Sequence, residues 1–303
     1  MRLDHAADFV TLASAGIAAS SAANARGAYL VAPEGFSLAA QSAGDNRYMD
    51  LSRAVSSERA MAQHRGLHRA LSGVLPTICF AGDAATPDAV FPNNVFGTAP
   101  GKLILGHMRH PVRQREAERA DIRGFFTGVL GYATHDLRQQ PGICELTGSM
   151  VIDRARGLGF AAYTERCDEA GADAMHAAFG LKASFRFALK PHEYHANVVM
   201  SVLASRVLVI CPDSFVDPAA AEAIASFYAP RVIELSTQEK NAFAGNCIAL
   251  SDDVVWMSEA AADALAPQHR AALERAGFRL GSVALDEIEK AGGSLRCCVG
   301  EIF

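Results

Sequence analysis

Short apolar runs alternate with polar turns and amphipathic segments along most of the chain. Three pairs of these runs are separated only by brief polar turns, a pattern that predicts β-hairpins. The predicted hairpins pair residues 149–153 with 159–163, 198–203 with 207–211, and 247–250 with 254–257. A helical pattern follows each hairpin, at residues 171–179, 218–228 and 259–276, and returning strands are predicted at 231–235 and 279–283. The second half of the chain therefore predicts repeated units of strand, turn, strand, helix and strand.

The first half and the C-terminus carry the same kinds of elements. We expect strands at residues 27–32, 76–80 and 102–108, the last pairing back on 95–96, and helices at 51–74 and 113–128, the second on the surface. The final stretch, 294–303, predicts a strand in which Cys297 and Cys298 point to opposite faces, because side chains alternate along a strand. If this strand completes the unit that begins at Gly27, the chain holds five such units and its two ends meet.

Five polar residues recur at a spacing of 50 or 51 positions: Asn94, Glu145, His195, Asn246 and Cys297. Each lies at or just before the start of an apolar run. A period of this size is typical of propellers and other repeat arrays. We therefore predict an α/β fold, a closed five-module α/β propeller, in which the starts of the strands converge on one axis. Glu145, His195 and Cys297 would then meet at that axis.

The repeats also suggest a simple domain organisation. We expect one catalytic domain spanning residues 27–303, because no linker interrupts the repeats. Residues 1–26 are rich in Ala and Ser and predict a poorly constrained N-terminal arm or helix. Part of this stretch loosely resembles the core of a signal peptide, but Asp4 and Asp8 give it the wrong charge pattern for export.

Composition narrows the class of protein further. Half of the residues are hydrophobic and a fifth are charged, which permits a full globular core. The formal net charge of −5 and the lack of a basic block argue against nucleic acid as a partner. Seven scattered cysteines, an odd number, fit a reducing compartment and a cytoplasmic protein better than a disulfide framework. No apolar run reaches the ~18 residues that a membrane helix needs, so no membrane partner is expected.

No motif indicates a metal, nucleotide or organic cofactor. His64 and His68 lie one helical turn apart, a spacing that can bind a metal ion. No third ligand is apparent, so we expect an ordinary helix face, exposed or half-buried, rather than a metal site.

A Cys, a His and a Glu at one site suggest nucleophilic catalysis. Cys attacks as a thiolate, and a nearby imidazolium stabilises that form. A Glu that contacts the imidazole orients it and favours its cationic state. Cys297, His195 and Glu145 are the candidates. The alternative is that these three residues are unrelated and share only their spacing.

Five motifs surround these positions and are specific in combination: Pro87-Asp88-Ala89-Val90-Phe91-Pro92-Asn93-Asn94, Glu145 with Thr147-Gly148-Ser149-Met150-Val151, Tyr194-His195-Ala196-Asn197-Val198, Gly245-Asn246, and Gly292-Gly293-Ser294-Leu295-Arg296-Cys297. They resemble the guanidino-group-modifying enzymes, the pentein superfamily of arginine deiminases, dimethylarginine dimethylaminohydrolases and amidinotransferases. The resemblance runs from about residue 28 to residue 303. Its nearest branch is that of bacterial arginine-deiminase-related proteins, which includes citrulline hydrolases. The superfamily is known for a five-module α/β propeller.

The resemblance implies a role for each of the three candidates. Cys297 would attack the central carbon of a guanidino or ureido group. His195 would protonate the leaving amine and then activate water, and Glu145 would hold His195. Cys298 corresponds to a position of varied residues and receives no role.

The resemblance also implies substrate-binding residues. Asp88 matches a residue that contacts the amino-acid end of the substrate in relatives. Arg166 resembles the carboxylate-binding arginine of a Ser-x-Arg-Thr motif, although Cys167 replaces the Thr. Arg113 is a second candidate for binding the carboxylate. Both arginines could instead be ordinary surface charges.

Two asparagines depart from the deiminase pattern. Deiminases carry carboxylates at the positions of Asn94 and Asn197, where they form charge-assisted hydrogen bonds to a guanidinium. An amide offers one acceptor and one donor group instead, which suits a neutral ureido group. Dihydrolase relatives that accept guanidines also have Asn at the first position, and either residue could be purely structural.

These considerations give a leading function and two alternatives. The leading hypothesis is hydrolysis of citrulline to ornithine, ammonia and carbon dioxide. The second is an arginine deiminase, dihydrolase or methylarginine hydrolase. The third is a catalytically silent propeller that binds an amino acid or a protein. Amidinotransfer fits less well. The expected partner is a small amino-acid substrate, and a homo-oligomer is compatible with the sequence.

Overall fold

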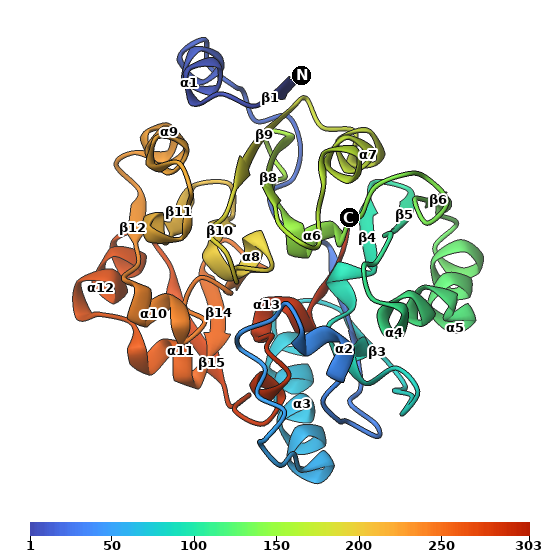
Figure 1. Cartoon of the computed structure of the whole chain (residues 1–303). Helices are drawn as coiled ribbons and strands as arrows, with labels where there is room; N and C mark the ends of the chain where they lie inside the picture. The colour runs from blue at the N-terminus through green and yellow to red at the C-terminus, as the bar shows by residue number, and fades with distance from the viewer.

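The structure, a computed structural model, describes residues 1–303 and contains five separate β-sheets (Figure 1). In each sheet an antiparallel pair is extended by a third strand that runs parallel to the second. The sheets are β16 (Gly300–Ile302), β2 (Gly27–Val31) and β3 (Thr77–Phe80); β4 (Phe96–Ala99), β5 (Lys102–Leu105) and β6 (Ala133–Asp136); β7 (Met150–Asp153), β8 (Leu158–Tyr163), β9 (Ala183–Ala188) and β1 (Arg2–Leu3); β10 (Met200–Leu203), β11 (Val207–Ile210) and β12 (Val232–Glu234); and β13 (Ile248–Ala249), β14 (Val254–Ser258) and β15 (Arg279–Val283).

The sheets lie around the middle of the molecule (Figure 1). One sheet joins the two ends of the chain, because β16 near the C-terminus pairs with β2 near the N-terminus. The C-terminal strand β16 pairs with β2 as expected, and Gly300 lies opposite Tyr29. Only glycine fits there, since an added Cβ would lie 2.0 Å from the Tyr29 ring. The first strands of neighbouring sheets contact each other, β7 with β10, β10 with β13, and β16 with β4. The predicted α/β class is confirmed.

At least one helix connects the second and third strands of each sheet, other helices lie before the first strands or between sheets, and most of the helices are at the periphery (Figure 1). They are α1 (Ala6–Ser14), α2 (Ala40–Ala43), α3 (Ser57–Ser72), α4 (Pro111–Gln114), α5 (Ala120–Gly124), α6 (Leu146–Ser149), α7 (Glu169–Phe179), α8 (Ala196–Val199), α9 (Pro218–Tyr228), α10 (Thr237–Asn241), α11 (Glu259–Ala264), α12 (Pro267–Arg275) and α13 (Leu295–Cys298), with 3-10 turns at Pro87–Val90, Pro92–Asn94, Arg115–Glu118, Pro212–Ser214 and Ile288–Lys290 and a π-helical turn at Phe125–Val129.

Two predicted helices are wrong in detail. The stretch 259–276 forms two helices, α11 and α12, because Pro267 lacks the N–H that an unbroken helix would need and begins α12 instead. The stretch 113–128 is not one surface helix. It divides into short segments at Arg119, whose ψ of 99° is not helical, and its first segments turn Arg113 and Glu116 inward.

A one-turn helix or 3-10 turn precedes the first strand of four sheets. These are the turn Pro92–Asn94 before β4, α6 before β7, α8 before β10, and α13 before β16. The apolar runs of these stretches therefore begin as helical turns and only then become strands. The prediction that Cys297 and Cys298 lie in a strand is wrong for this reason, because both belong to α13.

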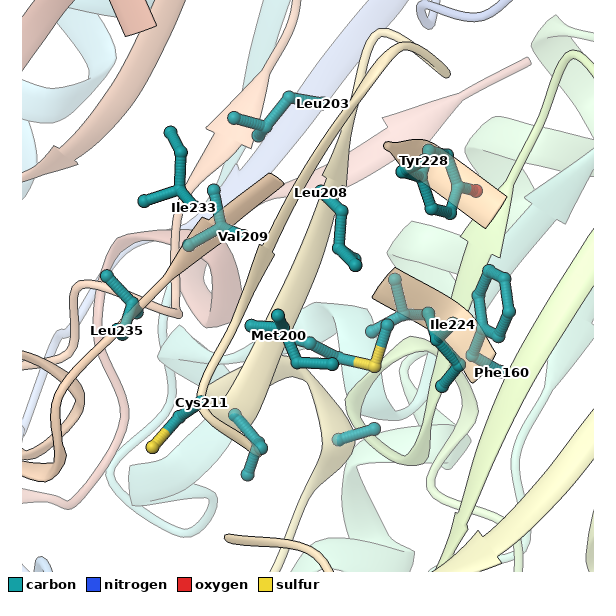
Figure 2. Packing of buried hydrophobic residues seen from close by; sticks show 14 of the residues in the cluster. Phe160, Met200, Leu203, Leu208, Val209, Cys211, Ile224, Tyr228, Ile233 and Leu235 are labelled. Atoms are coloured by element: carbon teal, nitrogen blue, oxygen red, sulfur yellow. The ribbon is translucent and has the colours of Figure 1, made fainter. Parts of the chain in front are cut away.

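The largest hydrophobic cluster fills the space between the sheet β10–β11–β12 and its neighbours (Figure 2). All four residues of β11 are buried, which accounts for its continuous Val-Leu-Val-Ile sequence. Figure 2 shows the side chains of Met200 in β10 and Leu208 in β11. They lie between these strands and Ile224 and Tyr228 of α9. Tyr228 also donates a hydrogen bond to the buried carboxylate of Asp153 over 2.7 Å, which ties this module to β7.

Residues 1–26 pack against the sheet that contains β9. Strand β1 pairs in parallel with β9, and α1 contacts α9. Phe9 is buried, with its ring stacked on Phe185 at a centroid distance of 5.1 Å and edge-on to Phe160 at 5.8 Å. The N-terminal stretch is thus anchored by aromatic packing. None of the helices combines the length and apolar character needed to cross a membrane.

The His64–His68 pair on α3 has no metal-site surroundings. No group of three or more His, Cys, Asp or Glu side chains is placed to hold a metal ion. His64 is buried, and its Nε2 has no hydrogen-bond partner. Burial, with a smaller contribution from His68, lowers the pKa of His64 to about 4.

We predict that His64→Leu makes folding less sensitive to acid. The unfolded chain binds a proton at this residue below about pH 6.5, whereas the folded protein binds it only near pH 4, so the stability that His64 contributes is lost across this window. The substitution should remove up to about 3 kcal/mol of that loss. Denaturant unfolding at pH 7 and pH 4.5 measures it. His68→Leu is the control, and an equal change in both variants would contradict the prediction.

Candidate active site

Glu145, His195 and Cys297 are positioned by three different sheets. Glu145 directly precedes α6 and β7, His195 directly precedes α8 and β10, and Cys297 lies in α13 before β16. Because the first strands of neighbouring sheets contact each other, these turns come together at the same end of the sheets. The backbone after Glu145 is strained, since Leu146 adopts a φ of +24°.

Glu145 and His195 form a fully buried pair. Nε2–H of His195 donates to Oε2 of Glu145 over 2.9 Å, and both side chains are 0% exposed. Burial alone would raise the pKa of Glu145, but the charge of Arg166 and the contact with His195 outweigh it and lower the pKa. Burial lowers the pKa of His195 to about 4 despite Glu145. Nδ1 of His195 is buried without a partner and is free to exchange a proton.

Cys297 is buried and held by two asparagine side chains. Nδ2 of Asn246 donates to its Sγ over 3.3 Å, and the Cys297 backbone N–H donates to Oδ1 of Asn246, also over 3.3 Å. The thiol donates to Oδ1 of Asn197 over 3.7 Å. Burial raises the pKa of Cys297. Burial thus favours a thiol and a neutral imidazole, although Glu145 acts in the expected direction and raises the pKa of His195.

A small cavity adjoins Cys297. It is lined by Ser42, Asn46, Met49, Asp88, Phe91, Asn94, Arg113, Arg166, Tyr194, Ala291, Gly293 and Cys297. Its volume of about 10 Å³ is room for about one water molecule. Ligand pockets are typically about 300–1,000 Å³, so this site is closed. Asn197 is not among the lining residues, because it lies against the sulfur instead.

Two oxygen acceptors at this cavity lack donors. Asp88 is buried, and its Oδ2 accepts from the Ser42 hydroxyl while its Oδ1 has no partner. Oδ1 of Asn94 is likewise buried and unpartnered. Burial raises the pKa of Asp88, and Arg113 and Ser42 counteract part of that effect. A buried oxygen without a donor costs free energy, so both oxygens are suited to a ligand that supplies N–H groups.

Arg113 is neither a surface charge nor a free carboxylate receptor. It is 2% exposed, and its Nε and Nη2 donate to Glu116 over 3.0 and 2.9 Å. Nη2 also contacts the carbonyl oxygens of Asp88 and Phe91. These contacts brace the Asp88 turn against the helical segments around Glu116.

Arg166 is also buried and paired. Its Nη2 donates to Oδ1 of Asp45 over 2.6 Å, its Nε contacts both Asp45 oxygens at 3.2 Å, and its Nη1 lies 3.4 Å from Glu145. Its guanidinium lies 4.8 Å from the centroid of the Tyr194 ring, in cation–π contact. Arg166 is therefore not an ordinary surface charge, which was the alternative to a carboxylate-binding role.

The sequence reasoning missed Asp45 and Tyr194, and gave Asn246 no role. The Tyr194 ring lies 4.6 Å from the His195 ring, and its hydroxyl donates to the carbonyl of Gly292, five positions before Cys297. Asn246 bonds to Cys297 itself. The regular spacing pointed to Asn246, but no local signal marks Asp45, which reaches Arg166 from a distant segment.

A second, larger cavity of about 860 Å³ lies outside the first. It is lined by Gly44, Asp45, Arg109, His110, Tyr163, Thr164, Glu165, Leu189, Lys190, Pro191, His192, Glu193 and Tyr194. Tyr194 borders both cavities, and the Asp45–Arg166 pair joins a residue that lines the outer one to a residue that lines the inner one.

Comparisons with known proteins bear on this site. The chain matches the family model described as N,N dimethylarginine dimethylhydrolase, eukaryotic, over residues 32–303. It is 28% identical over 263 residues to the N(G),N(G)-dimethylarginine dimethylaminohydrolase of Mycobacterium tuberculosis (strain ATCC 25618 / H37Rv), with 85% of this chain and 80% of that protein covered.

Solved structures show the same fold. The N-terminal domain of a substrate-bound mutant of ArgZ, an arginine dihydrolase from the ornithine–ammonia cycle in Cyanobacteria, superposes with a TM-score of 0.79 at 20% identity, covering 91% of this chain and 97% of that one. A dimethylarginine dimethylaminohydrolase in an adduct with S-methyl-L-thiocitrulline gives a TM-score of 0.71 at 19% identity, covering 91% and 99%.

The packing of α6 against the site predicts that Gly148 tolerates no side chain. A Cβ there would lie 2.6 Å from Oδ1 of Asn94 and 2.7 Å from Cε1 of His195. Gly148→Ala should therefore displace His195 and destabilise the fold by about 1–3 kcal/mol. Thermal unfolding measures it against Gly124→Ala in the short helix α5, where an added Cβ meets nothing within 4 Å. Equal stability of the two variants would contradict this packing.

Proposed function

Because the chain belongs to the N,N-dimethylarginine dimethylhydrolase family described by the eukaryotic model, we propose that it hydrolyses the guanidino C–N bond of arginine or an N-methylated arginine. The reaction would proceed through a covalent intermediate on Cys297. The protein would thus be a hydrolase of carbon–nitrogen bonds other than peptide bonds. The observation that carries this proposal is the pair of unpartnered acceptors at the cavity, Oδ1 of Asp88 and Oδ1 of Asn94.

These acceptors suit a guanidinium better than a urea. A guanidinium has five N–H donors and no acceptor, and it carries a positive charge. Asp88 offers that cation a carboxylate, and charge-assisted hydrogen bonds are about twice as strong as neutral ones. Asn94 and Asn197 supply no anion for a guanidinium, but Asp88 lines the same cavity as Asn94. The carboxylate of Asp88 removes the reason to prefer a neutral substrate.

Binding of a cation would also activate the nucleophile. The resting Cys297 is a thiol because burial raises its pKa. A guanidinium beside the sulfur favours the thiolate by direct charge attraction. The thiol proton then moves to Nδ1 of His195, which has no partner, while Glu145 stabilises the resulting imidazolium.

Two chemical steps would follow. The Cys297 sulfur bonds to the guanidino carbon, and His195 returns its proton to the departing amine, which leaves as ammonia or a methylated amine. An S-linked thiouronium remains on the enzyme. His195, again neutral, takes a proton from water as the water oxygen attacks the same carbon. Cleavage of the C–S bond releases a ureido product, citrulline, and the sulfur recovers its proton through His195.

Hydrolysis of citrulline itself stays as the second candidate. Asn94 contributes an amide to the cavity, whose N–H group could donate to a ureido oxygen. In that case the enzyme would release ornithine, ammonia and carbon dioxide, either from citrulline alone or as a continuation of arginine hydrolysis.

We further infer the finer architecture and setting of the enzyme. The repeated sheet plan and the contacts between first strands support a five-module α/β propeller of the pentein type. Residues 27–303 would form its single catalytic domain, with residues 1–26 attached through α1. The abundance of free cysteines supports a cytoplasmic location.

The two adjacent cysteines give a direct test of covalent catalysis. Cys297→Ala should lower kcat by about 10³-fold or more, because the nucleophile is lost. Cys298→Ala should retain most activity, since Cys298 is buried and, unlike Cys297, does not line the inner cavity. Turnover of arginine and mass-spectrometric mapping of a haloacetamidine label measure both. A label confined to Cys298, together with an active Cys297→Ala variant, would contradict the assignment.

The charge of the substrate can be tested at Asp88. We predict that Asp88→Asn lowers kcat/KM for arginine or methylarginines by about 10- to 100-fold, with a smaller effect on citrulline, because only a cation needs the carboxylate. The separate variant Asn94→Asp should weaken citrulline turnover relative to the wild type. Ammonia, methylamine and ornithine release from each substrate measures these effects. A wild type that prefers citrulline, with Asp88→Asn indifferent to substrate charge, would favour the second candidate instead.

A further inference from the structure

Arg166 already holds a carboxylate in the geometry expected for a bound ligand. Asp45 accepts from Nη2 at 2.6 Å and from Nε at 3.2 Å, a side-on, bidentate arrangement. The Arg166 side chain is 2% exposed, and that of Asp45 is 11% exposed at the wall of the outer cavity. A carboxylate from a distant segment thus occupies the arginine that the family resemblance assigns to the substrate carboxylate.

The other buried arginine of the site is paired differently. Arg113 bonds to Glu116, three positions along the same segment, and both side chains are 2% exposed. That pair is local, joining α4 to the 3-10 turn that follows it, and Glu116 lines neither the inner nor the outer cavity. Asp45 lies instead on the connection between β2 and α3, whose Ser42, Asn46 and Met49 form one wall of the inner cavity.

The connection must move before a substrate can reach Cys297. The inner cavity has room for about one water molecule, and Asp45, which lines the 860 Å³ outer cavity, is paired with Arg166, which lines the inner one. Two side chains hold Asp45 from the outer side, His110 through Nε2 at 3.0 Å and Arg109 through Nε at 3.7 Å. His110 and Arg109 remain beside Asp45 as hydrogen-bond and ion-pair partners when it leaves Arg166.

We infer that Asp45 is an internal competitor that occupies the carboxylate-binding position of Arg166 in the free enzyme and yields it to the α-carboxylate of the substrate. This inference rests on the proposed function, because it takes Arg166 as the receptor of the substrate carboxylate. The exchange replaces one Arg–carboxylate pair with another, so it leaves no buried charge unpaired. A guanidine without a carboxylate would displace Asp45 and leave Arg166 with Glu145 alone.

Guanidines without a carboxylate are disfavoured because they leave Arg166 without the carboxylate that Asp45 supplied. Breaking a buried ion pair by removing one partner is strongly unfavourable, whereas exchanging partners is nearly neutral. Asp45 also weakens binding of the correct substrate. The apparent affinity decreases as the fraction of enzyme in which Arg166 is free to bind a carboxylate decreases. Amino acids with an α-carboxylate are therefore accepted, and decarboxylated guanidines such as agmatine are rejected.

The first experiment measures binding without turnover. Dissociation constants of arginine and agmatine are determined by calorimetry for Cys297→Ala and for Cys297→Ala/Asp45→Asn. Removing the competitor should tighten arginine binding by about tenfold and agmatine binding by a similar factor, because both ligands must displace Asp45. Weaker arginine binding in the double variant would overturn the inference, because Asp45 would then be a direct ligand of the substrate or a purely structural residue.

The control removes a negative charge from the same cavity. Glu165 lines the outer cavity and its side chain pairs with Arg109 at 2.7 Å, whereas the ion-pair partners of the neighbouring Arg166 are Asp45 and Glu145. Glu165→Gln in the Cys297→Ala background should leave arginine affinity within about twofold. An equal gain from Glu165→Gln and Asp45→Asn would overturn the inference, since the effect would then be general attraction of an anion.

The second experiment needs no guanidine substrate. Asp45→Ala empties the carboxylate-binding position of Arg166, and acetate is small enough to fill it. Acetate should raise the melting temperature of Asp45→Ala in a saturable manner, relative to equal sodium chloride, and should leave the wild type and Glu165→Ala unchanged. Absence of this rescue would overturn the inference. Rescue in an enzyme that turns over no guanidine would support the carboxylate-binding position and reject the proposed function, so the two failures can be told apart.

Discussion

The site depends on one buried carboxylate, that of Glu145. It lies 2.9 Å from His195 and 3.4 Å from Arg166, and all three side chains are shielded from water. A buried anion is stable only with paired donors, and here the donors come from separate turns brought together by different sheets. The same anion therefore orients the imidazole proposed to move protons and anchors the arginine proposed to bind the substrate's other end. Chemistry and recognition are coupled through it.

This coupling explains why the resting site is closed and uncharged at the sulfur. Burial that strengthens the Glu145 pairs also lowers the pKa of His195 and raises that of Cys297. In the proposed mechanism, Cys297 therefore stays a thiol until the cationic substrate binds. Asp88 and Asn94 leave acceptors free for that cation, so the empty site lacks a partner that the substrate supplies. A thiol that is protonated when the site is empty is also protected from unwanted oxidation.

The sequence predicted the contact between Glu145 and His195. It did not predict the one-turn helices that hold or follow the candidate residues. The regular spacing of Glu145, His195 and Cys297 and the pairing of the last strand with the first were both readable, and the resemblance to guanidino-modifying enzymes is confirmed. The one-turn helices were not, because their apolar residues look like the beginnings of strands. Ion pairs were also out of reach. Asp45 and Arg166 are 121 positions apart, and nothing in either segment indicates the other. The same limit affected the asparagines, since only the structure shows Asn197 behind the sulfur and Asp88 at the cavity.

The central claim is that Cys297 bonds to the guanidino carbon while His195 completes the hydrolysis. Intact-protein mass spectrometry of His195→Gly, quenched with acid after incubation with arginine or a methylarginine, tests it most directly. The account predicts an adduct whose mass is that of the substrate minus its leaving amine, located by peptide mapping on Cys297 and absent from a Cys297→Ala/His195→Gly variant. An unmodified protein that still releases product, or an adduct on another residue, would contradict it.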